Sequence, residues 1–374
     1  MTKRLAILGA GCAGLSLAIH LSRVDRNFEL TLVDQRTEFG RDRTWAFWPT
    51  EPHPFEDCVQ HRWNEWSVRL FDRQTVHHSQ RYPYSMIPSD AFYDFALDKI
   101  HEDDRMNLVL DTPVRSVDSH QRTARIHGDD RTMDVNYVFD SRPSSRGDAP
   151  MYQHFKGWFV KSNRPVFNPN RVRLMDFWKE TENGVHFMYQ LPTTKNQSLF
   201  EATWISGEPF SDDTYESYLR KYLEDEDSNF KYEVLHEEAG AIPLSLETPS
   251  MSSNRVIPIG SAGGATRAST GYTFLGIQRS SRRIARAVTG GSEPGYSPVW
   301  SRTARFLDSL FLSFLERHPD RGPRVFFDLF QNCPPRPLVR FLSDRAGPLD
   351  YLNVMNAMPK KDMIREFIRT IGRG

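Results

Sequence analysis

The chain has 374 residues, of which 39% are hydrophobic and 26% charged, which predicts about two globular domains with a sizeable core. Lysine plus arginine equals aspartate plus glutamate at 48 each, and this zero net charge argues against nucleic acid as a partner. The three cysteines, Cys12, Cys58 and Cys333, show no metal-ligand spacing and cannot build a disulfide framework. We therefore expect no metal site and a reducing compartment.

The sequence contains no run of 18 or more apolar residues, so no transmembrane helix is expected. A basic start, MTKR, is followed by only four apolar residues before a glycine loop begins. A secretory signal needs a longer apolar region, so we interpret the run as a strand and expect a cytoplasmic protein.

The first elements predict a βαβ unit. Residues 5–8 are a short apolar run typical of a central parallel strand, a glycine loop follows at 9–14, and a helical pattern leads to a second strand at 30–33. A further buried strand is expected at 137–140. The other expected elements are strands at 172–176, 185–189 and 255–260 and helices at 211–227, at 274–288 and from 301 onward.

This order predicts an α/β protein with an α+β insertion, in which a Rossmann-like nucleotide-binding domain is split in two. The expected parts are residues 1–150, the first half of the nucleotide-binding domain, and 251–292, its second half. Residues 151–250 are rich in aromatic residues and form an antiparallel-sheet substrate domain. Residues 293–374 form a helical C-terminal region.

The glycine loop carries the chemistry of a dinucleotide site. Gly9, Gly11 and Gly14 fit G-x-G-x-x-G, in which the glycines allow a tight turn, close approach of a pyrophosphate, and close helix–strand packing. Asp34 ends the second strand at the distance expected of a ribose-binding acid. The alternative is a glycine turn that only packs a helix on a sheet.

A second glycine-rich loop favours FAD over NAD, because flavoproteins close a late strand–loop–helix over the flavin. The residues expected to bind there are Gly260, Ser261, Gly263 and Gly264. Such loops usually carry Gly-Asp, with the carboxylate on the ribityl hydroxyls. Here Ser261, the backbone or another side chain must make that contact.

Three segments resemble those of lycopene cyclases of the bacterial lycopene beta-cyclase type. Residues 43–48 (RTWAFW) resemble the TWSF-type motif, 198–203 (SLFEAT) the acidic strand motif written FLEET in plants, and 258–272 (PIGSAGGATRASTGY) the GxAGG…(S/T)TGY signature. Weaker matches lie at 174–177, 189–192, 238–243 and 356–360. The resemblance covers nearly the whole chain.

The resemblance implies a redox-neutral cyclisation in carotenoid biosynthesis. A proton adds to an acyclic ψ end of lycopene or a related linear carotene, the ring closes, and a proton is lost to give a β-ionone ring. It also implies that reduced FAD is the active cofactor and that NAD(P)H keeps it reduced.

The resemblance makes Glu201 the candidate catalytic acid. A carboxyl on an apolar strand has a raised pKa and can stay protonated. Ala202 stands where FLEET has its second acid, so Glu201 is the only acid that this motif supplies. The alternative is a glutamate on the solvent face of a strand.

Further site residues are expected on the matched segments. Arg43, with Arg41, could clamp FAD phosphate or adenosine, or could be a surface arginine. Thr270, Gly271 and Tyr272 are expected beside the isoalloxazine. Aromatic rings stabilise cations, and the candidates for substrate binding, which could equally be core residues, are Trp45, Phe47, Trp48 and Trp204.

The substrate and the C-terminus together predict peripheral membrane association. Apolar residues at 363, 364, 367, 368 and 371 recur at helical spacing, with basic residues interleaved. This pattern suits an anionic lipid surface, and equally a terminal helix packed on the body.

Two alternatives to a cyclase remain open. One is an FAD-dependent monooxygenase or prenyl reductase of the same fold, and the other is a non-catalytic carotenoid- or flavin-binding protein. Of these three kinds of protein, only a cyclase converts its substrate into a product of the same mass.

Overall fold

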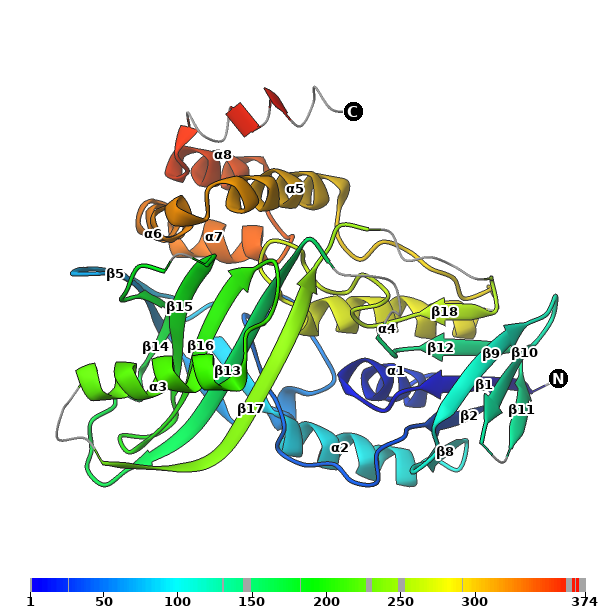
Figure 1. The fold of residues 1–374 in the computed structure, drawn as a ribbon. Coiled ribbons are helices and arrows are strands. Elements are labelled where there is room, and N and C mark those ends of the chain that lie inside the picture. Colours follow the sequence, from blue (N-terminus) through cyan, green and yellow to red (C-terminus); the bar gives the residue numbers. More distant parts are fainter. Residues whose placement is uncertain are drawn as a thin grey trace.

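Figure 1 shows the computed structural model of the chain, in which a nucleotide-binding layer, a large twisted sheet and a group of C-terminal helices pack together. The structure describes residues 2–25, 27–129, 131–143, 149–181, 183–226, 231–247, 253–290, 292–360, 365, 366, 368 and 369. In that part of the chain, no helix is long and apolar enough to cross a membrane.

The nucleotide-binding domain is built on a five-stranded sheet in the order β18-β12-β1-β2-β8, and every neighbouring pair is parallel. This confirms the α/β, Rossmann-like fold class. The helices α1, α2 and α4 pack around it. The bounds are β1 Lys3–Leu8, α1 Cys12–Ser22, β2 Phe28–Val33, α2 Ser89–His101, β8 Met106–Val109, β12 Tyr137–Asp140, β18 Val256–Pro258 and α4 Phe274–Gly290.

The second sheet has seven strands in the order β17-β13-β16-β15-β14-β5-β6 and is antiparallel except between β14 and β5. Two of its strands, β5 and β6, come from the first 150 residues, so position 150 does not separate the two sheets. The bounds are β5 Glu65–Leu70, β6 Arg73–His78, β13 Met151–Ser162, β14 Arg171–Phe177, β15 Val185–Pro192, β16 Gln197–Ser206 and β17 Tyr232–Leu244.

The two faces of this sheet are buried against different partners, as alternation along β16 shows. Phe200, Ala202 and Trp204 pack beneath α3 (Asp212–Glu226), which crosses one face of the sheet in Figure 1. Leu199 and Ile205 point the other way, into the main core shared with the C-terminal helices. Nine of the ten residues of β16 are buried, including the polar Glu201 and Thr203, because both faces of the strand are covered.

The C-terminal helices close the second face. They are α5 (Arg302–Arg317), α6 (Gly322–Asn332), α7 (Pro335–Leu342) and α8 (Pro348–Ala357), with α8 outermost (Figure 1). Two small three-stranded sheets complete the fold. Their strands are β3 Thr44–Phe47, β7 Tyr84–Pro88 and β4 His61–Trp63, and β9 Val114–Ser119, β10 Ala124–Gly128 and β11 Thr132–Val135.

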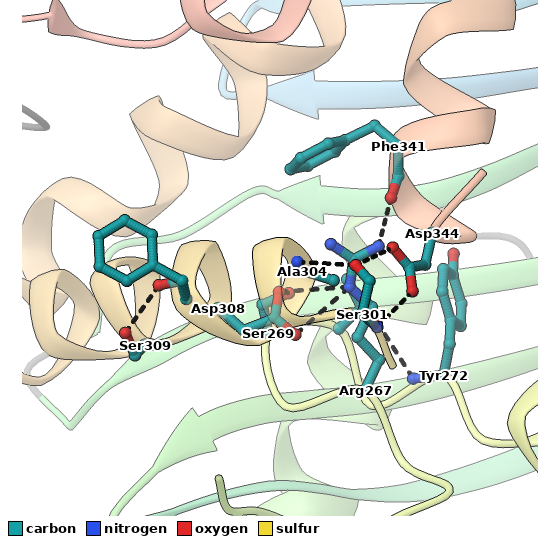
Figure 2. A network of polar contacts seen from close by, with 11 residues as sticks. Arg267, Ser269, Tyr272, Ser301, Ala304, Asp308, Ser309, Phe341 and Asp344 are labelled. Atoms are coloured by element: carbon teal, nitrogen blue, oxygen red, sulfur yellow. Dashed lines mark hydrogen bonds and ion pairs between the residues drawn. The ribbon is translucent and has the colours of Figure 1, made fainter. Parts of the chain in front are cut away.

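A buried ion pair ties the helical region to the loop before α4. The Arg267 Nε lies 3.2 Å from Asp308 Oδ1 on α5, and both side chains are buried. Ser269 Oγ donates to the same carboxylate at 2.7 Å, and Arg267 Nη1 donates to the Phe341 carbonyl on α7 (Figure 2). This cluster therefore anchors the loop that carries Tyr272.

Candidate functional site

The first glycine loop leaves the N-terminus of α1 open. Gly11 precedes the helix, and among the described residues no side chain caps it, so the first amide N–H groups of α1 are left for a ligand. A Cβ at Gly11 would have only Arg36 Nη2 nearby, at 3.8 Å, whereas a Cβ at Gly14 would lie 1.9 Å from the Gly9 carbonyl oxygen. Gly14 thus allows the helix to pack, and Gly11 leaves room for a pyrophosphate on the helix dipole.

Asp34 is buried at the end of β2 and braces this loop. Its Oδ2 accepts from the Ala10 amide at 2.6 Å, and its Oδ1 accepts from the Arg36 amide at 2.8 Å. Burial acts to raise its pKa, but the hydrogen bonds from Arg36 and Ala10 prevail and lower it. The ionised carboxylate stands beside the loop, where the ribose of a dinucleotide would lie.

The late glycine loop lies directly against the first one. Gly260 has φ +66, and a Cβ there would lie 2.7 Å from Ala13 Cβ on α1. Gly263 and Gly264 complete the turn, in which a Cβ at Gly263 would lie 2.5 Å from the Pro258 carbonyl oxygen. Ser261 is exposed, and its hydroxyl accepts from Thr266 at 3.3 Å. The two loops together fit an extended dinucleotide.

The turn that follows faces the large sheet. Arg267 N donates to the Tyr272 carbonyl and Gly271 N donates to the Arg267 carbonyl, both at 2.9 Å. Thr270 Oγ1 accepts from Tyr272 N at 3.3 Å. A Cβ at Gly271 would lie 2.7 Å from Gln153 Oε1 on β13, so the turn touches the sheet. A flavin bound to the glycine loops would therefore reach the sheet face near Tyr272.

An acidic row crosses that face. Glu238 on β17 pairs with Gly157 on β13, Gly157 pairs with Glu201 on β16, and Glu201 pairs with Tyr189 on β15. Directly paired residues of antiparallel strands point to the same side, so the four positions share one face. Sequence reasoning expected Glu201 alone; the structure places a second glutamate two strands away.

Both carboxyl groups are buried, with Glu201 8% and Glu238 4% exposed. Burial first, and then the Glu238 carboxyl, raise the pKa of Glu201 well above its usual value. Burial also raises the pKa of Glu238, whereas hydrogen bonds with Glu201 and Thr44 and then the cations Arg43 and Arg41 act in the opposite direction. Glu201 is therefore the group of the pair that holds its proton more strongly.

Aromatic side chains surround the acidic row. The Tyr189 hydroxyl lies 3.0 Å from that of Tyr84, and the Tyr272 hydroxyl is close enough to affect the pKa of Tyr84. The Trp48 ring lies 4.7 Å from Tyr84 and 5.7 Å from Tyr272, centroid to centroid. A cavity of about 30 Å³ lies beside Trp48 and Tyr272 and is lined mostly by apolar atoms. The arrangement is largely buried and presents aromatic rings that can stabilise a cation.

Arg43 lies between the cofactor loop and the acids. Its Nη1 donates to the Ala239 carbonyl on β17 at 3.2 Å. Arg43 is also near Cys12 of the glycine loop. Burial raises the pKa of the Cys12 thiol to about 12, and the positive charge of Arg43 acts to lower it. The Arg41 guanidinium lies over the ring of Phe159, 4.7 Å from the ring centroid, and Phe159 belongs to the same sheet as Ala239. Both arginines are thus within electrostatic range of Glu238.

Comparison with known proteins identifies the family. The chain matches the family described as "Lycopene cyclase protein" over residues 4–367. The chain belongs to this lycopene cyclase family. It is 22% identical to a lycopene beta-cyclase of Pantoea ananas, over 95% of this chain and 94% of that protein. It is 23% identical to a chloroplastic neoxanthin synthase of Solanum tuberosum, over 91% of this chain and 74% of that protein.

Solved structures share the fold. A geranylgeranyl bacteriochlorophyll reductase-like protein of Thermoplasma acidophilum has a TM-score of 0.66 at 11% identity, covering 97% of this chain and 98% of that one. A flavoprotein/dehydrogenase of Cytophaga hutchinsonii has a TM-score of 0.63 at 13% identity, covering both chains completely. At such identities the likeness shows the fold alone.

Not all of the residues expected from the lycopene cyclase motifs meet at the acids. Of the aromatic residues around β3, Trp48 joins Tyr84 and Tyr272, whereas Phe47 stacks on Phe274 at 4.5 Å and Trp45 packs on Phe92 at 4.9 Å. These two rings therefore belong to the core of the nucleotide-binding domain.

Trp204 also lies apart from Glu201. Because side chains alternate along β16, Trp204 points to the opposite face of the sheet, where it packs on Tyr218 of α3 at 4.8 Å. Trp204 therefore lies on the opposite side of the sheet from Glu201, and its expected role in substrate binding stays a prediction. The residues that sequence reasoning missed are Glu238, Gly157, Tyr84 and Tyr189, although Glu238 and Tyr189 lie in the weaker family matches.

Proposed function

We propose that the chain binds FAD and cyclises the acyclic ψ ends of lycopene to β-ionone rings without net redox change. The observation that supports it most is the buried Glu201 carboxyl, which lies near a cluster of aromatic side chains that includes Tyr272, from the turn after the late glycine loop. Protonating an unactivated alkene needs an acid kept neutral by burial, cation stabilisation and exclusion of water. The site around Glu201 offers all three.

In this proposal Glu201 gives its proton to the terminal alkene of a ψ end, which leaves a tertiary cation. The neighbouring alkene attacks that cation and closes the six-membered ring. A ring proton then returns to the carboxylate, so protons balance over the cycle. The rings of Trp48, Tyr84 and Tyr272 would stabilise the cation, and Tyr189, paired with Glu201, would help to orient the acid.

The cofactor would be held by Gly9, Gly11 and Gly14 at its pyrophosphate, by Asp34 at its ribose, and by the late glycine loop at its ribityl and flavin parts. Reduced FAD, kept reduced by NAD(P)H, would supply negative charge that stabilises a developing cation electrostatically. The uncapped N-terminus of α1 and the open space above Gly11 support this assignment.

Analysis of the product mass tests the activity. Purified protein with chemically reduced FAD should convert lycopene in liposomes to products of the same mass that carry β-rings. Products of changed mass would point to the monooxygenase or prenyl reductase alternative. Bound but unchanged lycopene would point to a binding protein.

We also propose a peripheral, cytoplasmic-side membrane position, because a hydrocarbon substrate resides in the bilayer. On α8, Leu349, Leu352 and Met355 are 75%, 54% and 63% exposed and recur every three residues, so they share one face. Ile368 is 65% exposed in the same C-terminal region. The neighbouring residues 361–364, 367 and 370–374, on which the expected basic helix largely rests, lie outside the described residues.

A further inference from the structure

We propose that Glu238 is a positioning residue that shares a single proton with Glu201 across Gly157 and so keeps Glu201 protonated between turnovers. The proposal rests on the assignment of Glu201 as the acid and deepens it. Neither the FLEET-type motif nor the spacing of acids in the chain indicates this pair, because 37 positions separate the two glutamates.

Gly157 makes the pair possible. It lies between Glu201 and Glu238 in the register of three neighbouring strands, so the glutamates are not directly paired. A Cβ at Gly157 would lie 2.9 Å from Glu201 Cγ and 3.2 Å from Glu238 Cγ. Both side chains therefore bend over the glycine from opposite sides and fill the space that a side chain would take.

The surroundings of Glu238 require a proton in the pair. Its side chain is 4% exposed, and within the described residues neither of its carboxylate oxygens has a donor in full hydrogen-bonding geometry, although the Thr44 hydroxyl is close enough to lower its pKa. An ionised carboxylate buried without a donor is costly, and two adjacent ionised carboxylates are costlier still. One proton placed between them removes the repulsion and supplies the missing donor, as in other carboxyl pairs that share a proton.

The charges around the pair are unequal, which decides where the proton resides. Arg41 and Arg43 act on Glu238 and favour its ionised form. Within the part of the chain that the structure describes, Glu201 faces no cation that affects its pKa; its other titratable neighbours there are the uncharged Tyr189 and Tyr84. The proton therefore stays on Glu201, the carboxyl nearer the aromatic cluster, and Glu238 remains the anion that holds it there.

The proton count follows from this arrangement. Glu201 donates its proton to the alkene, and the pair then carries two negative charges opposite the cation. The proton released from the ring neutralises Glu201 again. The pair thus begins and ends each cycle with one proton, and no further acid or base is consumed.

Two variants test the pair, each read by the pH dependence of cyclisation and by infrared titration of the protonated carboxyl band. In Glu238→Gln the anion is lost, so the pKa of Glu201 should fall. In Gly157→Ala the new Cβ forces the two carboxyls apart and weakens their coupling. For both we expect the alkaline limb of the rate profile and the midpoint of the carboxyl band to move to lower pH, by about one unit or more in Glu238→Gln.

Matched controls separate this effect from damage to the sheet. Glu233→Gln removes an exposed charge from the same strand, and Gly207→Ala adds a Cβ where nothing lies within 4 Å. Neither should move the midpoint. Glu238→Asp keeps the charge and should retain a midpoint between those of the wild type and Glu238→Gln.

The outcomes distinguish the pair from the proposed function. Unchanged or raised midpoints in Glu238→Gln and Gly157→Ala would overturn the shared proton even if the protein cyclises lycopene. If the wild type does not cyclise lycopene, the proposed function fails, but the infrared titration still tests the pair. If Glu238→Gln does not fold, Gly157→Ala decides.

Discussion

Replacing Asp308 by leucine tests how the turn at residues 267–272 is held in place. The change removes the carboxylate that Arg267 and Ser269 share (Figure 2) and leaves the Arg267 guanidinium buried. Arg267 retains its bond to the Phe341 carbonyl, but that group carries no charge. Because the backbone of Arg267 hydrogen-bonds to Gly271 and Tyr272, loss of this anchor also loosens the turn.

The expected magnitude follows from burial. Removing one partner of a buried ion pair costs about 3–5 kcal/mol, because an uncompensated charge remains in the interior. The exposed pair of Arg115 and Asp129, whose side chains are 72% and 46% exposed, gives the matched control, for which Arg115→Met should cost at most about 1 kcal/mol. The double variant Arg267→Met, Asp308→Leu should recover most of the loss, because both charges are gone.

Urea unfolding followed by tryptophan fluorescence measures these differences, and absorbance measures retained FAD. We expect Asp308→Leu to unfold at lower urea and to lose FAD more readily than the control. A loss no larger than that of the control variant, or a double variant less stable than Asp308→Leu, would refute the reasoning.

Three further predictions concern the cofactor, the membrane and pH. Gly11→Val places a branched side chain on the pyrophosphate path, so the purified protein should lose its yellow colour; FAD bound at wild-type affinity would contradict this. Changing Leu349, Leu352 and Met355 together to serine should weaken binding to anionic vesicles by tenfold or more, because each side chain buried in the membrane contributes about 1.5–3 kcal/mol. Unchanged co-sedimentation with the vesicles would show that the membrane anchor lies elsewhere. Glu201→Gln should become more stable relative to the wild type as pH rises from the ordinary pKa of a glutamate to the raised pKa of Glu201: over that range the folded wild type holds a proton that the unfolded chain has released, so its free energy of unfolding falls with pH, by about 1.4 kcal/mol per unit of raised pKa. Equal stability of variant and wild type across that range, measured by urea unfolding, would argue that Glu201 titrates normally.

The sequence predicted the parts of the fold that depend on local pattern. The strands at 5–8, 30–33 and 137–140 and the helix at 274–288 are confirmed, because short apolar runs and helical periodicity report burial directly. The assignment of β5 and β6 to the large sheet could not be predicted. Which sheet a strand joins depends on contacts between distant segments, here a parallel pairing of β5 with β14.

The site was predictable only where a motif carries it. Glu201 and Trp48 come from family motifs, and the structure brings both to one region. Glu238 was missed because its partner lies two strands away in the sheet. The residue between them, Gly157, carries no functional group that would indicate a site. The position of Trp204 away from Glu201 could not be predicted, because a motif gives the strand, whereas the register of the strand decides the face.

Turnover of lycopene by Glu201→Gln with chemically reduced FAD tests the central claim most directly. The variant keeps the shape of the side chain, and reduced FAD removes any limitation from cofactor supply. We predict a folded, FAD-bound protein whose cyclisation rate falls by about a hundredfold or more, with part of the activity kept in Glu201→Asp. A Glu201→Gln protein that cyclises lycopene at a near-normal rate would show that the proton comes from elsewhere.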